Sequence, residues 1–164
     1  MRIQELILIY DYNYWANKKL LTSAAKVSQE QFVAPSAFPR GSLRGTFLHI
    51  LDAEVGWRML CEHSLEIEDL TEVEFPTVAS LEDRWHKEEA AMRAYLAALK
   101  DDDMSGIIRY TTPSGIKRER VLWHCLFHVV NHGTQHRSEA AALLTGFNQS
   151  PGDFDFSMFV IEKK

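Results

Sequence analysis

Several kinds of feature are scarce or missing in this sequence of 164 residues. No apolar run approaches the ~18–20 residues that a membrane-spanning helix needs. The N-terminus, which carries Gln4 and Glu5 among its apolar residues, lacks the apolar core and the small-residue cleavage site of a signal peptide. We therefore expect a cytoplasmic protein with no membrane partner.

A strongly basic surface is also missing. The formal net charge is −5 and the sequence pI is about 5.8, whereas nucleic acids and anionic membranes are bound by net basic faces. The densest basic stretch, residues 117–120, is short and is interrupted by Glu119. We interpret it as the solvated start of a helix and expect no nucleic-acid partner.

Cysteine is rare, with only Cys61 and Cys125 in the chain. The two lie far apart in the sequence, and each sits inside an apolar helical pattern. Small buried thiols are the favoured interpretation, and a disulfide or a metal thiolate is the less favoured alternative.

Several catalytic motifs are absent. The chain has no glycine-rich phosphate loop and no nucleophile elbow, so nothing indicates nucleotide chemistry. It has no His-Glu-x-x-His, which excludes a zincin protease. It also has no Glu-x-x-His, which excludes the di-iron carboxylate bundles.

What remains is an ordinary globular composition, 46% hydrophobic and 25% charged, in a chain of single-domain length. We expect one domain over residues 1–164. Apolar residues recur at helical spacing in four long segments, residues 2–26, 42–63, 80–100 and 118–145. Four such segments predict an all-α four-helix bundle. The connections are long, so crossovers are expected in place of tight up-down turns.

Capping residues suggest where these helices begin and end. Ser42 is the expected N-cap of the second helix, and Ser80 followed by Asp83 resembles a capping box for the third. Three acids at 101–103 should end the third helix, because negative charge is unfavourable at a helix C-terminus. Gly146 is the expected C-cap of the last helix.

Two smaller features complete the predicted fold. Residues 107–112 and 116–118 flank a Pro-Ser-Gly turn and predict a small hairpin before the last helix. The aromatic residues of the tail, residues 151–159, are expected to pack back on the bundle.

The chemistry concentrates in the last helix, where His124, His128, His132 and His136 recur every fourth residue. Side chains at i and i+4 share one face of a helix, so two imidazoles can share one ion. Three successive histidines of this series cannot share one ion, because the outer two lie about 12 Å apart along the helix axis. At about 100° per residue, His136 falls within the apolar face of the helix and His132 at its edge. His128 and His124 point toward the periphery. Gly133 should allow another helix or an exogenous ligand to approach closely.

A third ligand is expected from another helix, since catalytic sites usually have three protein ligands and an open position. The choices are His49, His63 and His86. His49 is favoured because it lies mid-helix on a surface of small residues, whereas His63 is at a helix end and His86 is among charged residues. Asp52 and Glu54 are candidate acceptors behind the ligands, with solvated surface the expected role of at least one.

Three segments carry a resemblance to a known family: residues 12–20 (YNYWANKKL), 49–54 (HILDAE) and 131–137 (NHGTQHR), followed by acids before aromatics in the tail. Over essentially the whole chain, the sequence resembles the DinB-like (YfiT-like) metal-binding four-helix bundles. The resemblance implies a metal held by His49, His132 and His136, a bundle with crossover connections, and a homodimer. The chain departs from the family pattern at residues 138–139, where Ser-Glu replaces a frequent Gly-Gln.

The resemblance also implies a function: a metal-dependent S-transferase that adds a low-molecular-weight thiol to an electrophile, in a pocket lined by Tyr12, Trp15 or Trp57. The alternative is a non-catalytic, stress-related metal-binding homodimer, and a weaker third hypothesis is metal-assisted hydrolysis with Asp52 or Glu54 as base. Three histidines with an open position suit zinc, nickel, iron or manganese. Arg137 is interpreted as structural.

Overall fold

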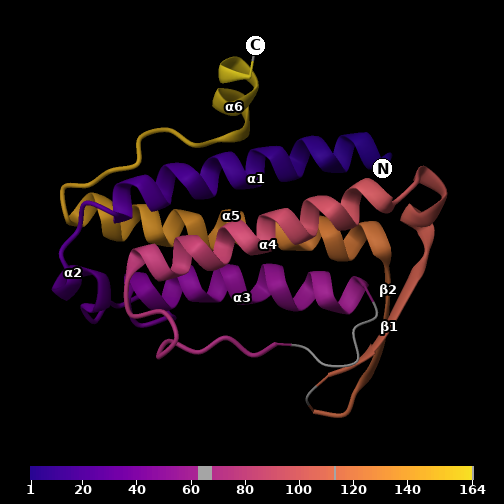
Figure 1. Ribbon diagram of the computed structural model, residues 1–164, viewed down its shortest axis with the longest axis horizontal. Coiled ribbons are helices and arrows are strands. Elements are labelled where there is room, and N and C mark those ends of the chain that lie inside the picture. The colour runs from indigo at the N-terminus through magenta and orange to yellow at the C-terminus, as the bar shows by residue number, and fades with distance from the viewer. Residues whose placement is uncertain (63–67, 113, 164) are drawn as a thin grey trace.

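The computed structural model describes residues 1–62, 68–112 and 114–163, and long helices dominate it (Figure 1). In chain order its elements are α1 (Ile3–Ala24), α2 (Gln29–Val33), α3 (Leu43–Cys61), α4 (Val78–Ala98), the 3-10 helix η1 (Asp101–Ser105), β1 (Ile107–Thr111), β2 (Lys117–Val121), α5 (Leu122–Gly146) and α6 (Phe156–Glu162). The four long helices and the hairpin are those that the sequence predicts. The short helices α2 and α6 were not predicted.

Helices α1, α3, α4 and α5 form a four-helix bundle. Helix α5 packs against α1 and α3, and α4 packs against the same two helices, so α1 lies diagonally opposite α3. Figure 1 shows that α3 and α4 run in the same direction, because residues 68–77 return along the length of the bundle. The predicted crossover connections are confirmed.

Capping residues explain where α3 and α4 begin. The cap of α3 is the predicted one, and the cap of α4 is not. The Ser42 hydroxyl accepts a hydrogen bond from the backbone N–H of Gly45, as expected for the N-cap of α3. Helix α4 begins earlier than predicted, because Thr77 is its N-cap and Ser80 completes the capping box by bonding back to Thr77. Asp83 lies inside the helix, and its predicted capping role is wrong.

The hairpin displaces the start of the last helix. Residues 117–120 pair with β1 as part of strand β2, with Ile107 opposite Val121 at one end of the ladder. The prediction of a solvated helix start at these residues is wrong, because their backbone gains ladder hydrogen bonds in place of the unpaired donors of a first helical turn. Helix α5 therefore begins at Leu122, whose N–H donates to the carbonyl of Gly106.

The remaining helix ends differ from the predictions by a few residues. Gly146 is the last helical residue of α5 rather than its cap, and Asn148 beyond it takes a positive φ of 60°. Helix α1 ends at Ala24, α3 at Cys61 and α4 at Ala98. The predicted end of α3 at residue 63 lies outside the described residues.

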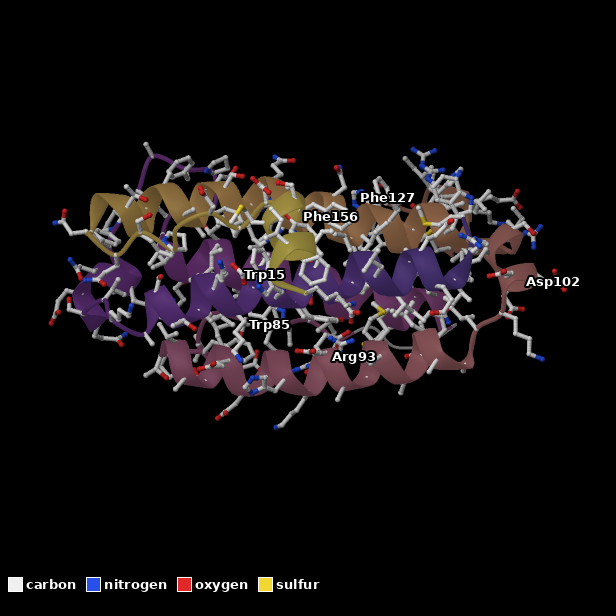
Figure 2. All side chains as sticks on the ribbon, turned by 90° about the horizontal axis from the view of Figure 1, so that it is seen from above. Trp15, Trp85, Arg93, Asp102, Phe127 and Phe156 are labelled. Atoms are coloured by element: carbon white, nitrogen blue, oxygen red, sulfur yellow. The ribbon has the colours of Figure 1, made fainter. Side chains whose placement is uncertain are left out.

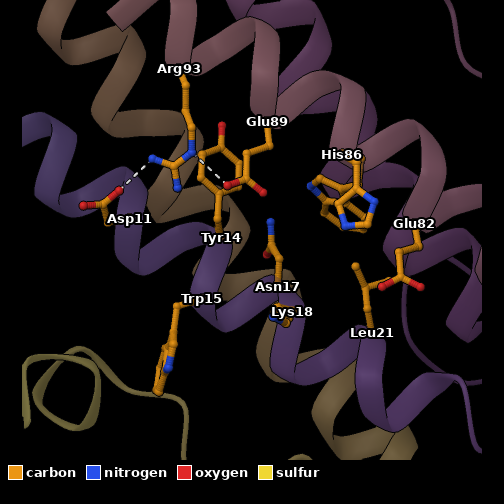
Figure 3. Close-up of a pocket in the computed structure, with 11 residues that line it drawn as sticks. Asp11, Tyr14, Trp15, Asn17, Lys18, Leu21, Glu82, His86, Glu89 and Arg93 are labelled. Carbon is orange, nitrogen blue, oxygen red and sulfur yellow. Dashed lines mark hydrogen bonds and ion pairs between the residues drawn. The ribbon is translucent and has the colours of Figure 1, made fainter. Parts of the chain in front are cut away.

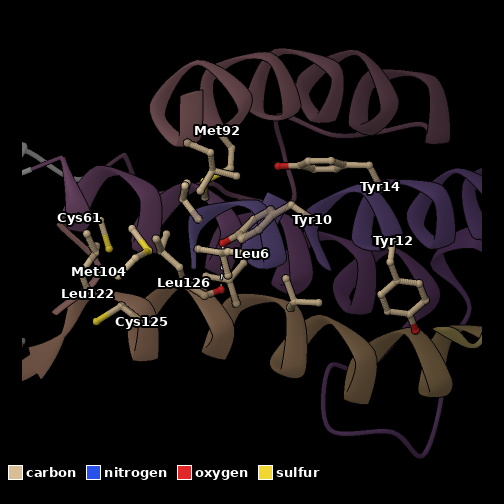
Figure 4. Close-up of a cluster of buried hydrophobic side chains, with 14 of the residues drawn as sticks. Leu6, Tyr10, Tyr12, Tyr14, Cys61, Met92, Met104, Leu122, Cys125 and Leu126 are labelled. Carbon is tan, nitrogen blue, oxygen red and sulfur yellow. Dashed lines mark hydrogen bonds between the residues drawn. The ribbon is translucent and has the colours of Figure 1, made fainter. Parts of the chain in front are cut away.

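The apolar faces meet in two buried clusters. One includes Leu6, Tyr10, Met92 and Leu126, and Figure 4 shows it between α1, α4 and α5. The second, which includes Leu51 and Leu144, fills the other part of the bundle. Within the described chain, no helix is both long and apolar enough to cross a membrane.

The tail returns to the bundle as predicted and forms α6 above α1 (Figures 1 and 2). The ring of Phe159 lies 5.7 Å from that of Trp15, and the ring of Phe156 lies 5.4 Å from that of Tyr12. The Asp155 carboxylate caps α6 by accepting from the N–H of Met158.

Candidate metal centre

Three histidines from two adjacent helices converge inside the bundle. His49 comes from the middle of α3, and His132 and His136 come from successive turns of α5. The Nε2 atoms of His49 and His132 lie 2.9 Å apart. The ring of His136 lies 4.6 Å from that of His49 and 4.5 Å from that of His132. One nitrogen from each residue can be chosen so that all three lie within 4.8 Å of one another.

The structure separates these three from the other histidines. His128 lies one turn earlier on α5, with its ring 5.7 Å from that of His132, and His124 is exposed beside Trp123. His86 lies in a different hollow, between α1 and α4, which holds none of the three (Figure 3). His63 lies outside the described residues. The predicted choice of His49, His132 and His136 as one group agrees with this geometry.

The surroundings keep two of the imidazoles neutral near pH 7. Burial lowers the pKa of His49 to about 4, and the positive charges of Arg40 and a protonated His136 act in the same direction. Burial likewise lowers the pKa of His132 to about 4, with His136 and His49 contributing. A neutral imidazole is the form that coordinates a metal, so the ligands need not lose a proton first.

The donor set fits a divalent ion. Three imidazole nitrogens from three residues match the protein ligands of known catalytic sites. Glu139 accepts a hydrogen bond from Nδ1 of His136 at 2.8 Å, which is the carboxylate–histidine contact common behind metal ligands. Nδ1 of His132 is buried and has no hydrogen-bond partner in the described part of the chain, so nothing outside the group competes for that ring.

Asp52 and Glu54 form no hydrogen bond with the three histidines in the described part of the chain. Glu54 is fully buried, and its carboxylate accepts hydrogen bonds from Asn13 at 2.8 Å, Asn17 at 3.0 Å and Trp85 at 2.9 Å. The predicted roles of Glu54 behind the ligands or on the solvated surface are therefore wrong. Asp52 is half-buried, and burial raises the pKa of its carboxyl group.

A polar network beside the histidines was missed by sequence reasoning. Arg137 is fully buried and donates to Asn13, to Asn17 at 2.9 Å and to Thr134 at 2.8 Å. Asn13 and Asn17 thereby join the guanidinium of Arg137 to the carboxylate of Glu54. The structural interpretation of Arg137 agrees with these contacts.

Gly133 allows another helix to approach closely, as expected. A Cβ atom at this position would lie 2.8 Å from Nη1 of Arg137 and 3.3 Å from Oδ1 of Asn13. The glycine makes room for the buried guanidinium and for a side chain of α1, so the approach that it permits is internal to the fold.

A cavity of about 370 Å³ opens beside the group of histidines. Its lining includes two of the three together with their neighbours: His49, Asp52, Trp57, Tyr110, His128 and His132. Trp57 was predicted to line this pocket. The predictions of Tyr12 and Trp15 are wrong, because Tyr12 is buried against Phe156 and Trp15 lines hollows on the far side of α1.

The two cysteines lie away from the histidines. Cys61 at the end of α3 and Cys125 in the first turn of α5 are both buried and free, and they lie at the same end of the bundle (Figure 4). The favoured interpretation of buried thiols is confirmed. Neither cysteine belongs to the group that could hold a metal.

The chain is similar to known proteins in both sequence and fold. The model of the DinB family matches residues 1–161. Protein DinB of Bacillus subtilis (strain 168) is 25% identical over an alignment of 163 residues, which covers 93% of this chain and 92% of that protein. The crystal structure of a DinB-like protein from Bacillus cereus ATCC 10987 matches with a TM-score of 0.74 at 17% identity, over 93% of this chain and 97% of the other. That structural likeness establishes the fold alone.

Proposed function

Because this chain belongs to the DinB family, we propose that it binds one divalent metal ion through His49, His132 and His136 and acts as a metal-dependent thiol S-transferase. The observation that supports this most directly is the convergence of the three imidazoles next to a cavity that two of them line. A functional site needs both parts, a set of ligands and an adjoining space for substrate.

The reaction transfers a low-molecular-weight thiol to an electrophile. The thiol loses its proton to water, its sulfur forms a bond to the electrophilic carbon, and the leaving group departs with the electron pair of the broken bond. A divalent ion in the site would supply a lowered thiol pKa and a fixed position for the sulfur.

The protein's own residues hold and orient the reactants. Glu139 fixes the ring of His136 through Nδ1, so the opposite nitrogen faces the other two imidazoles. Trp57 and Tyr110 wall the cavity, with ring centroids 5.8 Å apart in an edge-to-face arrangement. A reactant that enters the cavity is thus held between aromatic surfaces and beside His49 and His132.

Metal analysis of protein purified without an affinity tag tests the site. We expect about one zinc, nickel, iron or manganese ion per wild-type chain, and loss of that ion in His49→Ala, His132→Ala and His136→Ala. His128→Ala is the matched control, because it removes an imidazole one turn away on the same helix. Wild-type protein that takes up no metal after soaking in any of these four would contradict the proposal.

A second assay tests catalysis on the loaded protein. Consumption of a thiol together with an electrophile, above the uncatalysed rate and dependent on His132, supports the transferase. The alternative is a non-catalytic, stress-related metal-binding protein, favoured by the way the three imidazoles bridge α3 and α5. In that case metal removal lowers the melting temperature and the loaded protein gives no turnover.

Hydrolysis with Glu54 as base finds no support, because three hydrogen bonds already engage its buried carboxylate. Asp52, which lines the cavity, is the acid that remains for such a reaction. Formation of hydrolysis product from an ester in the absence of thiol, abolished in Asp52→Asn, would favour hydrolysis over transfer.

We further propose that the protein is a homodimer. Apolar side chains on α5 and α6 are exposed: Phe127 by 40%, Phe156 by 43% and Ile161 by 61%. Phe127 and Phe156 are labelled in Figure 2. Exposed apolar groups of this kind are typical of interfaces. Light scattering after size exclusion should give twice the chain mass for the wild type and the chain mass for the Phe127→Glu/Ile161→Glu variant.

The two free thiols fit a reducing compartment, so a cytoplasmic location is part of the proposal. Fractionation of the cells that express the protein would test it, and recovery outside the cytoplasm would contradict it.

A further inference from the structure

The cavity beside the histidines continues into a second hollow of about 420 Å³. The two share Trp57, Tyr110 and His128, and the second adds Arg120, His124 and Cys125. Together they form one groove between α3, α5 and the hairpin, referred to below as the α3–α5 groove. It begins at His49 and His132 and ends at Arg120.

The groove has a definite length and an apolar middle. His132 and His124 both line it and are eight residues apart on α5, which corresponds to about 12 Å along the helix axis. Between its ends lie Trp57 and Tyr110, and the ring of Trp57 is also 5.1 Å from that of His128. An occupant must therefore be extended, with an apolar or flat body.

The two ends of the groove differ in charge. Asp52 lies at the histidine end. At the far end, Arg120 has no carboxylate partner in the described part of the chain, and its only hydrogen bond there runs from Nη1 to the backbone carbonyl of Glu119 at 2.8 Å. The carboxylate of Glu119 is engaged elsewhere, by Arg109 at 2.7 Å.

The hairpin register places a second cation on the same face. Tyr110 is opposite Arg118, and alternation along β2 puts Arg118 and Arg120 on the face that Tyr110 presents to the groove. Lys117 and Glu119 belong to the opposite face. The far end of the α3–α5 groove is therefore cationic, and it is ready to receive an anion.

Resting on the proposed function, we infer that the thiol substrate carries a carboxylate about 10 Å from its sulfur, with the sulfur at the three histidines and the carboxylate at Arg120. The aromatic walls hold the spacer between them. A neutral thiol of the same length lacks the ion pair, and a short carboxylated thiol cannot reach both ends.

Calorimetric titration of the zinc-loaded protein tests this with three simple thiols: mercaptooctanoate, mercaptooctanol and mercaptopropionate. Mercaptooctanoate should bind about 2–5-fold more tightly than mercaptooctanol, the range expected for one exposed ion pair. It should also bind more tightly than mercaptopropionate. The preference for the octanoate should vanish in Arg120→Gln and persist in Lys117→Gln, which removes the same charge from the opposite face of the strand.

The outcomes separate the inference from the function on which it rests. Equal affinity for the two eight-carbon thiols in the wild type overturns the carboxylate site and leaves the transferase proposal intact. Equal losses in Arg120→Gln and Lys117→Gln also overturn it, because the effect is then one of net charge. Zinc-loaded protein that binds none of the three thiols removes both proposals. Circular dichroism and zinc content, measured on each variant, show that its fold and its metal are retained.

Discussion

Glu139 holds the ring of His136 by accepting a hydrogen bond from its Nδ1 atom at 2.8 Å, across one turn of α5. Both side chains are largely shielded, with 6% and 15% of the histidine and glutamate side chains exposed. The contact leaves Nε2 of His136 directed toward His49, whose ring lies 4.6 Å away.

Replacing Glu139 should therefore weaken metal binding without removing a ligand. We expect Glu139→Ala to lower zinc affinity by about 10–100-fold, the usual effect of losing such an acceptor, as measured by competition with a chromogenic chelator. Glu139→Gln retains a carbonyl oxygen that can accept from Nδ1, so its loss should be smaller. Ser138→Ala is the neighbouring control. Unchanged affinity in Glu139→Ala would show that the hydrogen bond does not orient the ligand.

The metal-free protein should lose stability as the pH falls from 7 to 5. In the folded state the pKa values of His49 and His132 are about 4, against the ordinary value of 6.5. Between these values the unfolded chain binds more protons than the folded one, so the free energy of unfolding decreases as the pH falls through this window. After allowance for solvent screening we expect a loss of about 1–2 kcal/mol between pH 7 and pH 5.

Urea denaturation at the two pH values, with a chelator present, measures this loss. The His49→Gln/His132→Gln variant is the control, since its difference between pH 7 and pH 5 should be smaller than that of the wild type. A difference of the same size in both proteins would assign the pH dependence to other groups.

The two cysteines should differ in reactivity although both are buried. The interaction between the two neighbouring thiols raises the pKa of Cys61 and lowers that of Cys125, and the positive charge of Arg120 favours the Cys125 thiolate further. The thiolate is the reactive form, so iodoacetamide should label Cys125 first, by about tenfold in rate. Peptide mass spectrometry over time gives the order. Labelling of Cys61 first, or of both at one rate, would contradict this assignment.

Much of the fold follows from patterns that the sequence carries locally. Helical periodicity identifies the four long helices, and the spacing of four along α5, combined with the position of its apolar face, selects His132 and His136 over His124 and His128. The Ser42 cap was readable because its hydroxyl bonds a backbone N–H three residues away. These features need no knowledge of the other helices.

The wrong predictions concern residues whose structure depends on contacts with residues far away in the sequence. Residues 117–120 look like a helix start until β1 is placed beside them, since only the partner strand supplies the ladder. Tyr12 and Trp15 belong to α1 and pack against α6, whereas the cavity is lined by α3, α5 and the hairpin, and this placement depends on how the helices pack together. Glu54 resembled a surface acid because its partners Asn13, Asn17 and Trp85 lie 31 or more residues away.

The buried network of Glu54 gives the last prediction. Glu54 and Arg137 are 1% and 0% exposed, and Asn13 and Asn17 bridge them. Glu54→Ala leaves the guanidinium without a counter-charge in the interior, a change that costs about 3–5 kcal/mol when one partner of a buried pair is removed. Urea denaturation of the zinc-saturated protein measures it. Asp83→Ala, an exposed acid on α4, should stay within about 0.5 kcal/mol of the wild type.

The Glu54→Leu/Arg137→Met variant shows where that energy comes from. Removing both charges together should restore part of the stability lost in Glu54→Ala, because no unpaired charge is left inside. If instead Glu54→Gln keeps full stability and loses only turnover, Glu54 acts on the substrate and the structural assignment fails. The geometry argues against that result, since both carboxylate oxygens of Glu54 are already bonded to the core, Oε1 to Asn13 and Asn17 and Oε2 to Trp85.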